Sequence, residues 1–66
     1  MRKQVRQVRQ HLGLNQVEFA ARLGVSPRSV QYWESGLTVP RVQSLRTIAA
    51  LGGRPVSWFY EEELVA

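Results

Sequence analysis

Two helix-start signals with a glycine between them constrain the fold more than any other feature of the sequence. Asn15 is followed three residues later by Glu18, the spacing of a capping box in which each side chain bonds the other residue's backbone N–H. Ser26 is a second helix cap, with a proline at the next position, where a helix needs no N–H donor. Gly24 suits the left-handed conformation that ends a helix. Residues 15–36 are therefore predicted to form a helix-turn-helix.

The second of these helices has one apolar and one polar face. At 100° per residue, Val30 and Trp33 fall on the side that must meet a core. The opposite side carries a guanidinium, an amide, a phenol and a hydroxyl, and no carboxylate: Arg28, Gln31, Tyr32 and Ser35. Such groups suit base edges and phosphates, but on a helix taken alone a polar face is more often ordinary solvated surface. Its interpretation therefore depends on the rest of the chain.

The chain is short and basic. Its 66 residues allow one domain, near the lower size limit for a core without disulfides, and it has no cysteine. Nine Lys and Arg residues oppose five Glu residues, three of which are Glu61, Glu62 and Glu63, so residues 1–60 carry a balance of +7. This asymmetry favours a polyanionic partner, although a basic balance also fits a membrane-surface or RNA-binding protein.

Several other classes are disfavoured. No apolar run reaches the roughly 18 residues of a membrane span, and the N-terminal residues lack the apolar segment of a signal peptide. We therefore expect a soluble, cytoplasmic protein without a membrane partner. The chain has no Asp, no Cys and a single histidine, His11, so neither a catalytic triad nor a zinc site is expected. We expect no enzyme activity, no metal and no cofactor.

A first helix is predicted over residues 1–12, where apolar residues recur at helical spacing. Arg9 lies within this apolar stripe, and Glu34 leans toward the inner side of its own helix, so the two are predicted to form a structural salt bridge. The alternative is that Arg9 reaches solvent and Glu34 merely lies near a helix end. Three further cations point away from the stripe and are expected to be solvated, near enough to a phosphate to help: Arg2, Lys3 and Arg6.

A further helix is predicted over residues 42–51, ended by the pair Gly52 and Gly53. The residues predicted to face the core from it are Val42, Leu45, Ile48 and Ala49.

Five segments in fixed order make the chain resemble the phage Cro and CI repressor type of helix-turn-helix domain, also called the XRE type. They read LGLNQVEFAARLGVS, VQYWESG, VP, LRTIAALG and VSWF. The resemblance runs from about residue 5 to residue 60 and implies an all-α, compact bundle of four or five helices of the lambda-repressor-like type. It also implies a DNA-binding domain over residues 1–60, which leaves residues 61–66 as a short acidic tail. The family's Arg–Glu pair matches Arg9 and Glu34.

The resemblance implies sequence-specific binding of double-stranded DNA, with the helix that begins at Pro27 in the major groove. Arg28 is the strongest candidate base reader, because a guanidinium fits the two acceptors on the guanine edge. The other candidates for the base-reading face are Gln31, Tyr32, Ser26, Pro27 and Ser35. The candidates for phosphate binding are Gln16, Arg41 and the backbone N–H groups of Gly36 and Leu37.

The same resemblance implies a transcriptional repressor that binds a pseudopalindromic operator as a homodimer. It places a short fifth helix near the end of the chain, where an aromatic cluster is predicted to form the dimer interface: Trp58, Phe59 and Tyr60. The alternative for these residues is that they close the bottom of the core. The alternative for the whole chain is an antitoxin-like or adaptor protein that binds a protein partner through this aromatic end.

Overall fold

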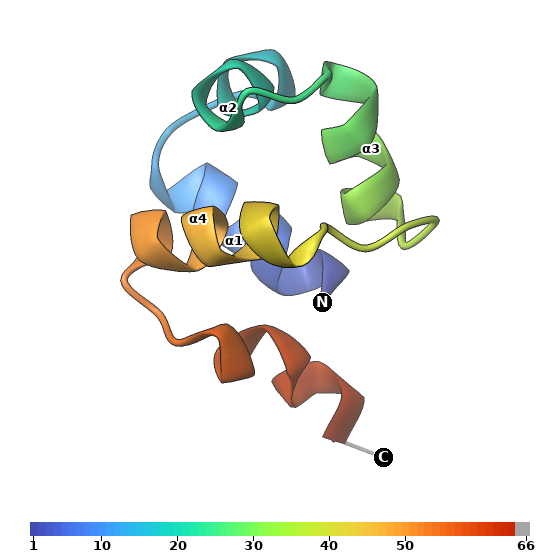
Figure 1. Cartoon of the computed structure of the whole chain (residues 1–66), viewed down its shortest axis with the longest axis vertical. Coiled ribbons are helices and arrows are strands. Elements are labelled where there is room, and N and C mark those ends of the chain that lie inside the picture. Colours follow the sequence, from blue (N-terminus) through green and yellow to red (C-terminus); the bar gives the residue numbers. More distant parts are fainter. Residues whose placement is uncertain (65–66) are drawn as a thin grey trace.

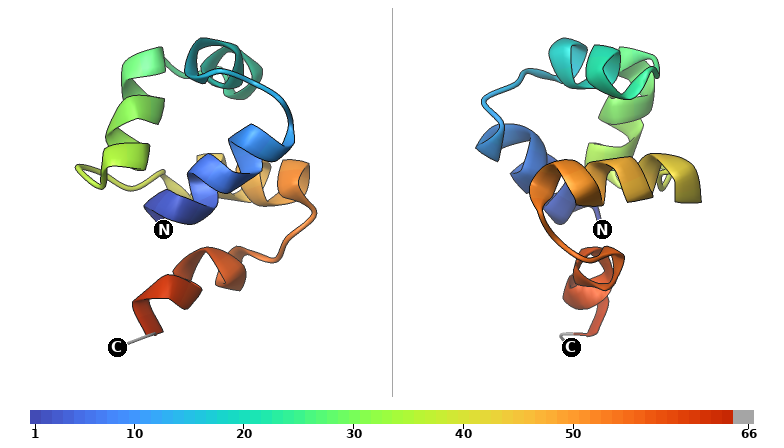
Figure 2. Two further views of the ribbon diagram at one scale, coloured as in Figure 1. Left: turned by 180° about the vertical axis from the view of Figure 1, so that it is seen from behind. Right: turned by 60° about the vertical axis from the view of Figure 1, so that its left-hand side comes forward.

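Residues 1–64, which the computed structural model describes, form four α-helices and one 3₁₀ helix (Figure 1). The elements are α1 (Arg2–His11), α2 (Gln16–Leu23), α3 (Pro27–Ser35), α4 (Val42–Gly52) and the 3₁₀ helix η1 (Val56–Leu64). Helices α1 and α4 cross at the centre, α2 and α3 lie on one side of them, and η1 lies on the other (Figure 2). The predicted all-α fold is confirmed.

The local signals of the helix-turn-helix act as predicted. Asn15 Oδ1 accepts from the Glu18 N–H at 2.8 Å, and Glu18 Oε1 accepts from the Asn15 N–H at 2.9 Å, which completes the capping box. Ser26 Oγ accepts from the Ser29 N–H at 3.2 Å and so caps α3. Gly24 has φ +70°, the left-handed conformation that lets the chain leave α2 and turn sharply into α3. The predicted helix-turn-helix is confirmed.

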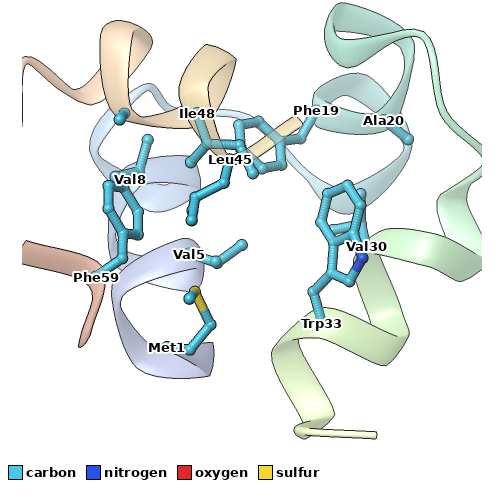
Figure 3. Close-up of a cluster of buried hydrophobic side chains, with 11 residues drawn as sticks. Met1, Val5, Val8, Phe19, Ala20, Val30, Trp33, Leu45, Ile48 and Phe59 are labelled. Carbon is cyan, nitrogen blue, oxygen red and sulfur yellow. The ribbon is translucent and has the colours of Figure 1, made fainter. Parts of the chain in front are cut away.

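Every helix contributes to one apolar core (Figure 3). The five largest side chains that are fully buried come one from each element, and each has 0% exposure: Val5, Phe19, Val30, Ile48 and Phe59. Burial of a side chain of this kind stabilises a fold by about 1.5–3 kcal/mol. Because the domain has no disulfide, this shared core is the main term that holds the elements together.

Helix α4 passes close to α1, and Gly52 is the residue that permits it. A Cβ atom placed at Gly52 would lie 2.7 Å from Cγ2 and 3.2 Å from Cγ1 of Val8. Val8 is buried and branched at Cβ, so it has little freedom to move aside. The predicted role of Gly52 was only to end the helix, and the structure adds a packing role.

Two details differ from the predictions. Val42, predicted to face the core, is 66% exposed, because it is the first residue of α4 and the inward side of that helix begins at Leu45. The predicted acidic tail starts as helical backbone, since η1 continues to Leu64. The part of the tail prediction that concerns residues 65–66 lies outside the described residues.

Candidate nucleic-acid interface

Helix α3 divides its residues between the core and the surface. Its inner side buries Val30, Trp33 and Glu34, which are 0%, 6% and 4% exposed. Its outer side brings together the candidate base readers that lie within the helix, all of them exposed: Pro27, Arg28, Gln31, Tyr32 and Ser35. The helix is therefore held from one side only, and the other side is open to a partner.

The side chains of Arg28, Gln31 and Tyr32 have no hydrogen bond or ion pair in the described part of the chain. A guanidinium brings five N–H donors, an amide brings donors and an acceptor, and a phenol brings one O–H. Donors and acceptors of these kinds match the edges of guanine and adenine in the major groove. The outer face thus carries polar groups that the fold itself does not use.

Ser26 and Ser35 are exposed, but each also holds an end of α3. The Ser26 hydroxyl caps the amino end and lies 3.1 Å from the Ser29 hydroxyl. The Ser35 hydroxyl donates to the Tyr32 carbonyl at 3.1 Å and accepts from the Leu37 N–H at 3.4 Å. A hydroxyl has two lone pairs, so both retain some capacity for a further hydrogen bond. The role of Ser35 in ending the helix was not foreseen from the sequence.

The backbone N–H groups of Gly36 and Leu37 are not available to a phosphate. The Gly36 N–H donates to the Trp33 carbonyl at 3.3 Å, and the Leu37 N–H donates to the Tyr32 carbonyl at 3.0 Å. The carboxyl end of a helix also carries partial negative charge, which disfavours an anion. The prediction that these two residues bind a phosphate through their N–H groups is therefore wrong, because the donors are used to end α3.

The two predicted phosphate-binding side chains lie on opposite sides of α3. Gln16, the first residue of α2, donates from Nε2 to Glu34 Oε1 at 3.3 Å, which places it beside the carboxyl half of α3. Arg41 is exposed just before α4, on the wall of an open groove of about 670 Å³ that Ser26 also lines. Ser26 and Trp33 line that groove along one side of α3, so the outer face is framed by Gln16 on one side and Arg41 on the other.

Arg9 and Glu34 form the predicted salt bridge, in bidentate geometry. Arg9 Nε donates to Glu34 Oε2 at 2.7 Å, and Arg9 Nη2 donates to Glu34 Oε1 at 2.9 Å. Arg9 Nη1 also donates to the Leu14 carbonyl at 3.0 Å. The Arg9 side chain is only 14% exposed and that of Glu34 is 1% exposed, so the alternative in which Arg9 reaches solvent is wrong. The hydrogen bond to Glu34 raises the pKa of Arg9 above its ordinary value.

Two more donors converge on the same carboxylate. Arg6 Nε donates to Glu34 Oε1 at 3.3 Å, and Gln16 reaches that oxygen as well. Arg6, expected to be solvated, keeps a 53% exposed side chain but is hydrogen-bonded through its Nε. Its position three residues before Arg9, on the same side of α1, was the signal that could have revealed this contact. Glu34 therefore links α1, α2 and α3 through polar contacts.

The surroundings of Glu34 have opposing effects on its pKa. Burial raises it, whereas the hydrogen bonds from Arg9 and Gln16, the Arg9 charge and the Arg6 hydrogen bond lower it. The lowering contributions prevail, so the pKa of Glu34 lies below its ordinary value. The carboxyl is accordingly an anion at neutral pH despite its burial.

The three C-terminal aromatic residues have different environments. Phe59 is 0% exposed and lies in the core, so its assignment to a dimer interface is wrong and the alternative, that it closes the core, is confirmed for this residue. Trp58 is half-buried, meets Phe59 edge to face at 5.0 Å between ring centroids, and lies beneath the Arg54 guanidinium at 4.8 Å. Tyr60 is 44% exposed. Trp58 and Tyr60 stay predicted interface residues.

Among the described side chains, those of residues 1–61, no three of the His, Cys, Asp and Glu types gather as a metal site. No helix among residues 1–64 has the length and apolar character needed to cross a membrane.

Comparison with known proteins gives one match. A family model described as helix-turn-helix matches residues 5–59, which span the chain from the first turn of α1 into η1. No curated protein and no solved structure matches the chain at a significant level.

Proposed function

We propose a specific role for this chain, which belongs to the helix-turn-helix family and is a DNA-binding regulator of the XRE type. It is a transcriptional repressor that binds a pseudopalindromic operator as a homodimer, and it acts by binding rather than by catalysis. The observation that carries the proposal is the division of α3: one side is locked into the core, and the other presents unused polar groups to solvent.

The outer face of α3 reads the bases. Arg28 donates two hydrogen bonds to the N7 and O6 acceptors of a guanine, the commonest specific contact in the major groove. Gln31 contacts an adenine, and Tyr32 contacts a thymine methyl group or a phosphate. Ser35 and Ser26 add contacts at the two ends of the helix, and Pro27 contributes only shape.

Gln16 and Arg41 set the position of α3 in the groove. Their location on opposite sides of the helix lets each contact a phosphate while the outer face lies against the bases. Such contacts add affinity for any sequence and fix the register, but they do not distinguish one base pair from another.

A homodimer supplies the contacts that one small domain lacks. The two copies place their α3 helices in successive major grooves, with half-site centres about 34 Å apart. A repressor of this kind works by occupancy, since an operator that overlaps a promoter excludes polymerase when it is bound.

Selection of bound sites from random duplex DNA tests the proposal, followed by affinity measurements on the selected site. We expect a two-fold symmetric consensus. Arg28→Ala should cost about 1–3 kcal/mol of specific binding and relax the choice at one base pair in each half-site. Arg41→Ala is the matched comparison, because it removes the same charge and should weaken all sequences alike. Equal losses for Arg28→Ala on the selected site and on random duplex would remove its base-reading role.

One observation favours a second candidate, a protein-binding role as an antitoxin-like or adaptor protein. Val56 and Tyr60 on η1 are 37% and 44% exposed, beside the half-buried Trp58. Failure of the random-DNA selection to enrich any sequence, together with a strictly monomeric protein, would favour this candidate over the repressor.

A further inference from the structure

A basic cleft lies between α1 and the carboxyl end of α3. Its volume is about 450 Å³, Glu34 lies on its wall, and the other lining residues are Arg2, Lys3, Arg6, Gln7, Gln10 and Ser35. Three cations, two amides and a hydroxyl thus face one opening. All of them except Ser35 come from two turns of α1.

The positive charge of the cleft is not neutralised within the described part of the chain. Its one carboxylate, Glu34, is already bound in bidentate fashion by Arg9. Arg2 and Lys3 are exposed and form no ion pair with the described side chains, those of residues 1–61. Two full charges therefore face the cleft, together with the remaining N–H groups of Arg6. An anion is the ligand that such a cleft selects.

The position of the cleft connects it to the outer face of α3. Ser35 belongs both to that face and to the wall of the cleft. Arg6 and Gln16 donate to the same oxygen of Glu34, so the cleft also adjoins the start of α2. The stem of Arg2 lies against the last turn of α3, since a Cβ atom at Gly36 would be 3.3 Å from Arg2 Cδ.

We propose that this cleft binds a backbone phosphate of DNA on the flank of the base pairs that α3 reads. Arg2 and Lys3 supply the charge, and Arg6, held in place by Glu34, supplies an oriented donor. The cleft takes over, at the same end of α3, the phosphate contact that the Gly36 and Leu37 N–H groups do not provide. The inference rests on the proposed DNA binding and adds to it a contact from α1.

The competing role for these cations is structural. Basic side chains near the carboxyl end of a helix interact favourably with its partial negative charge. Arg2 is placed to do this for α3. A structural role would change the stability of the free protein and leave the salt dependence of DNA binding as it was.

The test is the double variant Arg2→Gln with Lys3→Gln, in which both charges are lost and both side chains stay polar and compatible with a helix. Binding is measured over a range of salt concentrations, on a random-sequence duplex and on the duplex selected from random DNA. We expect the slope of log K against log salt to become shallower by about 2 on both duplexes. The preference between the two duplexes should stay unchanged, because phosphate contacts carry no sequence information.

Arg54→Gln is the matched control. It removes one exposed cation, where the double variant removes two. Arg54 lies over Trp58 and lines a separate pocket that shares only Gln7 with the cleft. Its slope should equal that of the wild type. Thermal unfolding of each free variant shows whether a change in binding comes with a change in stability.

The outcomes separate this inference from the proposed function. A slope unchanged from the wild type in the double variant overturns the phosphate cleft, whether or not the unfolding midpoint falls, and leaves the reading of bases by α3 intact. A wild type that shows no preference for any selected sequence overturns the proposed function. In that case, the slope of log K against log salt on random duplex still shows whether the cleft binds a phosphate.

Discussion

Glu34 is the residue at which three helices meet through polar contacts. Its carboxylate accepts from Arg6 and Arg9 on α1 and from Gln16 on α2. A buried ion pair adds little net stability over apolar residues of similar shape, but removal of one partner leaves an unpaired buried charge and costs about 3–5 kcal/mol. A domain of this size has a total stability of about 3–10 kcal/mol. Removal of only one member of the pair is therefore expected to cost a large share of the free energy of unfolding.

We predict that Glu34→Gln lowers the free energy of unfolding by about 3–5 kcal/mol at neutral pH, because Arg9 is left without its anion. In the variant, the part of the acid denaturation that comes from protonation of Glu34 should also be absent. The pKa of Glu34 is lowered in the folded state, so the unfolded chain binds more protons at pH values between the two pKa values. The contribution of Glu34 to the free energy of unfolding is thus fully present above the pKa of the unfolded state, about 4.3. It is lost as the pH falls toward the lower pKa of the folded state.

The measurement is urea or thermal unfolding of wild type and variant from pH 7 to pH 2. Glu61→Gln is the control, because Glu61 is exposed on η1 and its loss leaves the Glu34 network intact. The difference in stability between wild type and Glu34→Gln should shrink on acidification. A difference that stays constant across this range would contradict the assignment.

At the scale of elements, the sequence predicts what is decided locally. Asn15, Glu18 and Ser26 cap helices through bonds that span three residues, so the spacing alone reveals them. The bidentate bond between Arg9 and Glu34 was also predictable, because each residue falls on the inner side of its own helix.

Contacts set by how the helices cross were not predictable in the same way. The convergence of Arg6 and Gln16 on Glu34 depends on the positions of α1 and α2 relative to α3. Three consecutive aromatic residues on η1 do not show which one enters the core, and Phe59 was distinguished only by packing. The N–H groups of Gly36 and Leu37 were misassigned because the geometry of the helix end decides where they donate.

Gly52 joins two elements, and we predict that Gly52→Ala destabilises the domain. The added Cβ would meet the stiff Val8 side chain at 2.7 Å, and overpacking of this kind typically costs about 1–3 kcal/mol. Alanine gains at most about 1 kcal/mol over glycine in a helix, so the packing cost prevails. For a domain of this size, each kcal/mol lowers Tm by about 4–8 °C.

A double-mutant cycle with Val8→Ala isolates the contact. In the Val8→Ala background the methyl groups that collide with the new Cβ are absent, so Gly52→Ala should cost less or become stabilising. An unchanged cost in both backgrounds would place the effect somewhere other than the junction of α1 and α4.

At the scale of the whole molecule, charge is distributed unevenly. Eight of the nine basic residues lie on α1 to α4 and the segments that join these four helices, whereas Glu61, Glu62 and Glu63 fall on η1, on the far side of α1 and α4 from α2. Such an arrangement turns the basic side of the protein toward a polyanion during encounter. The longest extent of the chain is 33 Å, close to the separation of about 34 Å between adjacent half-sites, so two touching copies are of a suitable size to occupy both.

We predict that Tyr60→Ser weakens the proposed homodimer, because Tyr60 is the most exposed aromatic side chain of η1 and exposed tyrosines often dominate an interface. A loss of about 2 kcal/mol corresponds to about a 30-fold rise in the dimer dissociation constant. Sedimentation equilibrium measures that constant. Binding to a two-half-site duplex should weaken, while binding to a single half-site should not.

Val17→Ser is the matched control for this effect. Val17 is 62% exposed on α2, and that helix lies on the far side of α1 and α4 from η1. Val17→Ser should leave the dimer dissociation constant unchanged. A dimer that resists Tyr60→Ser would move the interface away from η1.

The two-sided character of α3 has a consequence for the history of such a regulator. The fold depends on Val30, Trp33 and Glu34 and makes no use of the side chains of Arg28, Gln31 or Tyr32. Exposed substitutions of that kind usually change stability by no more than about 0.5 kcal/mol. Under the proposed function, a duplicated gene can therefore acquire a new target site by substitutions at these positions, while the free energy of unfolding of its product stays close to that of the original.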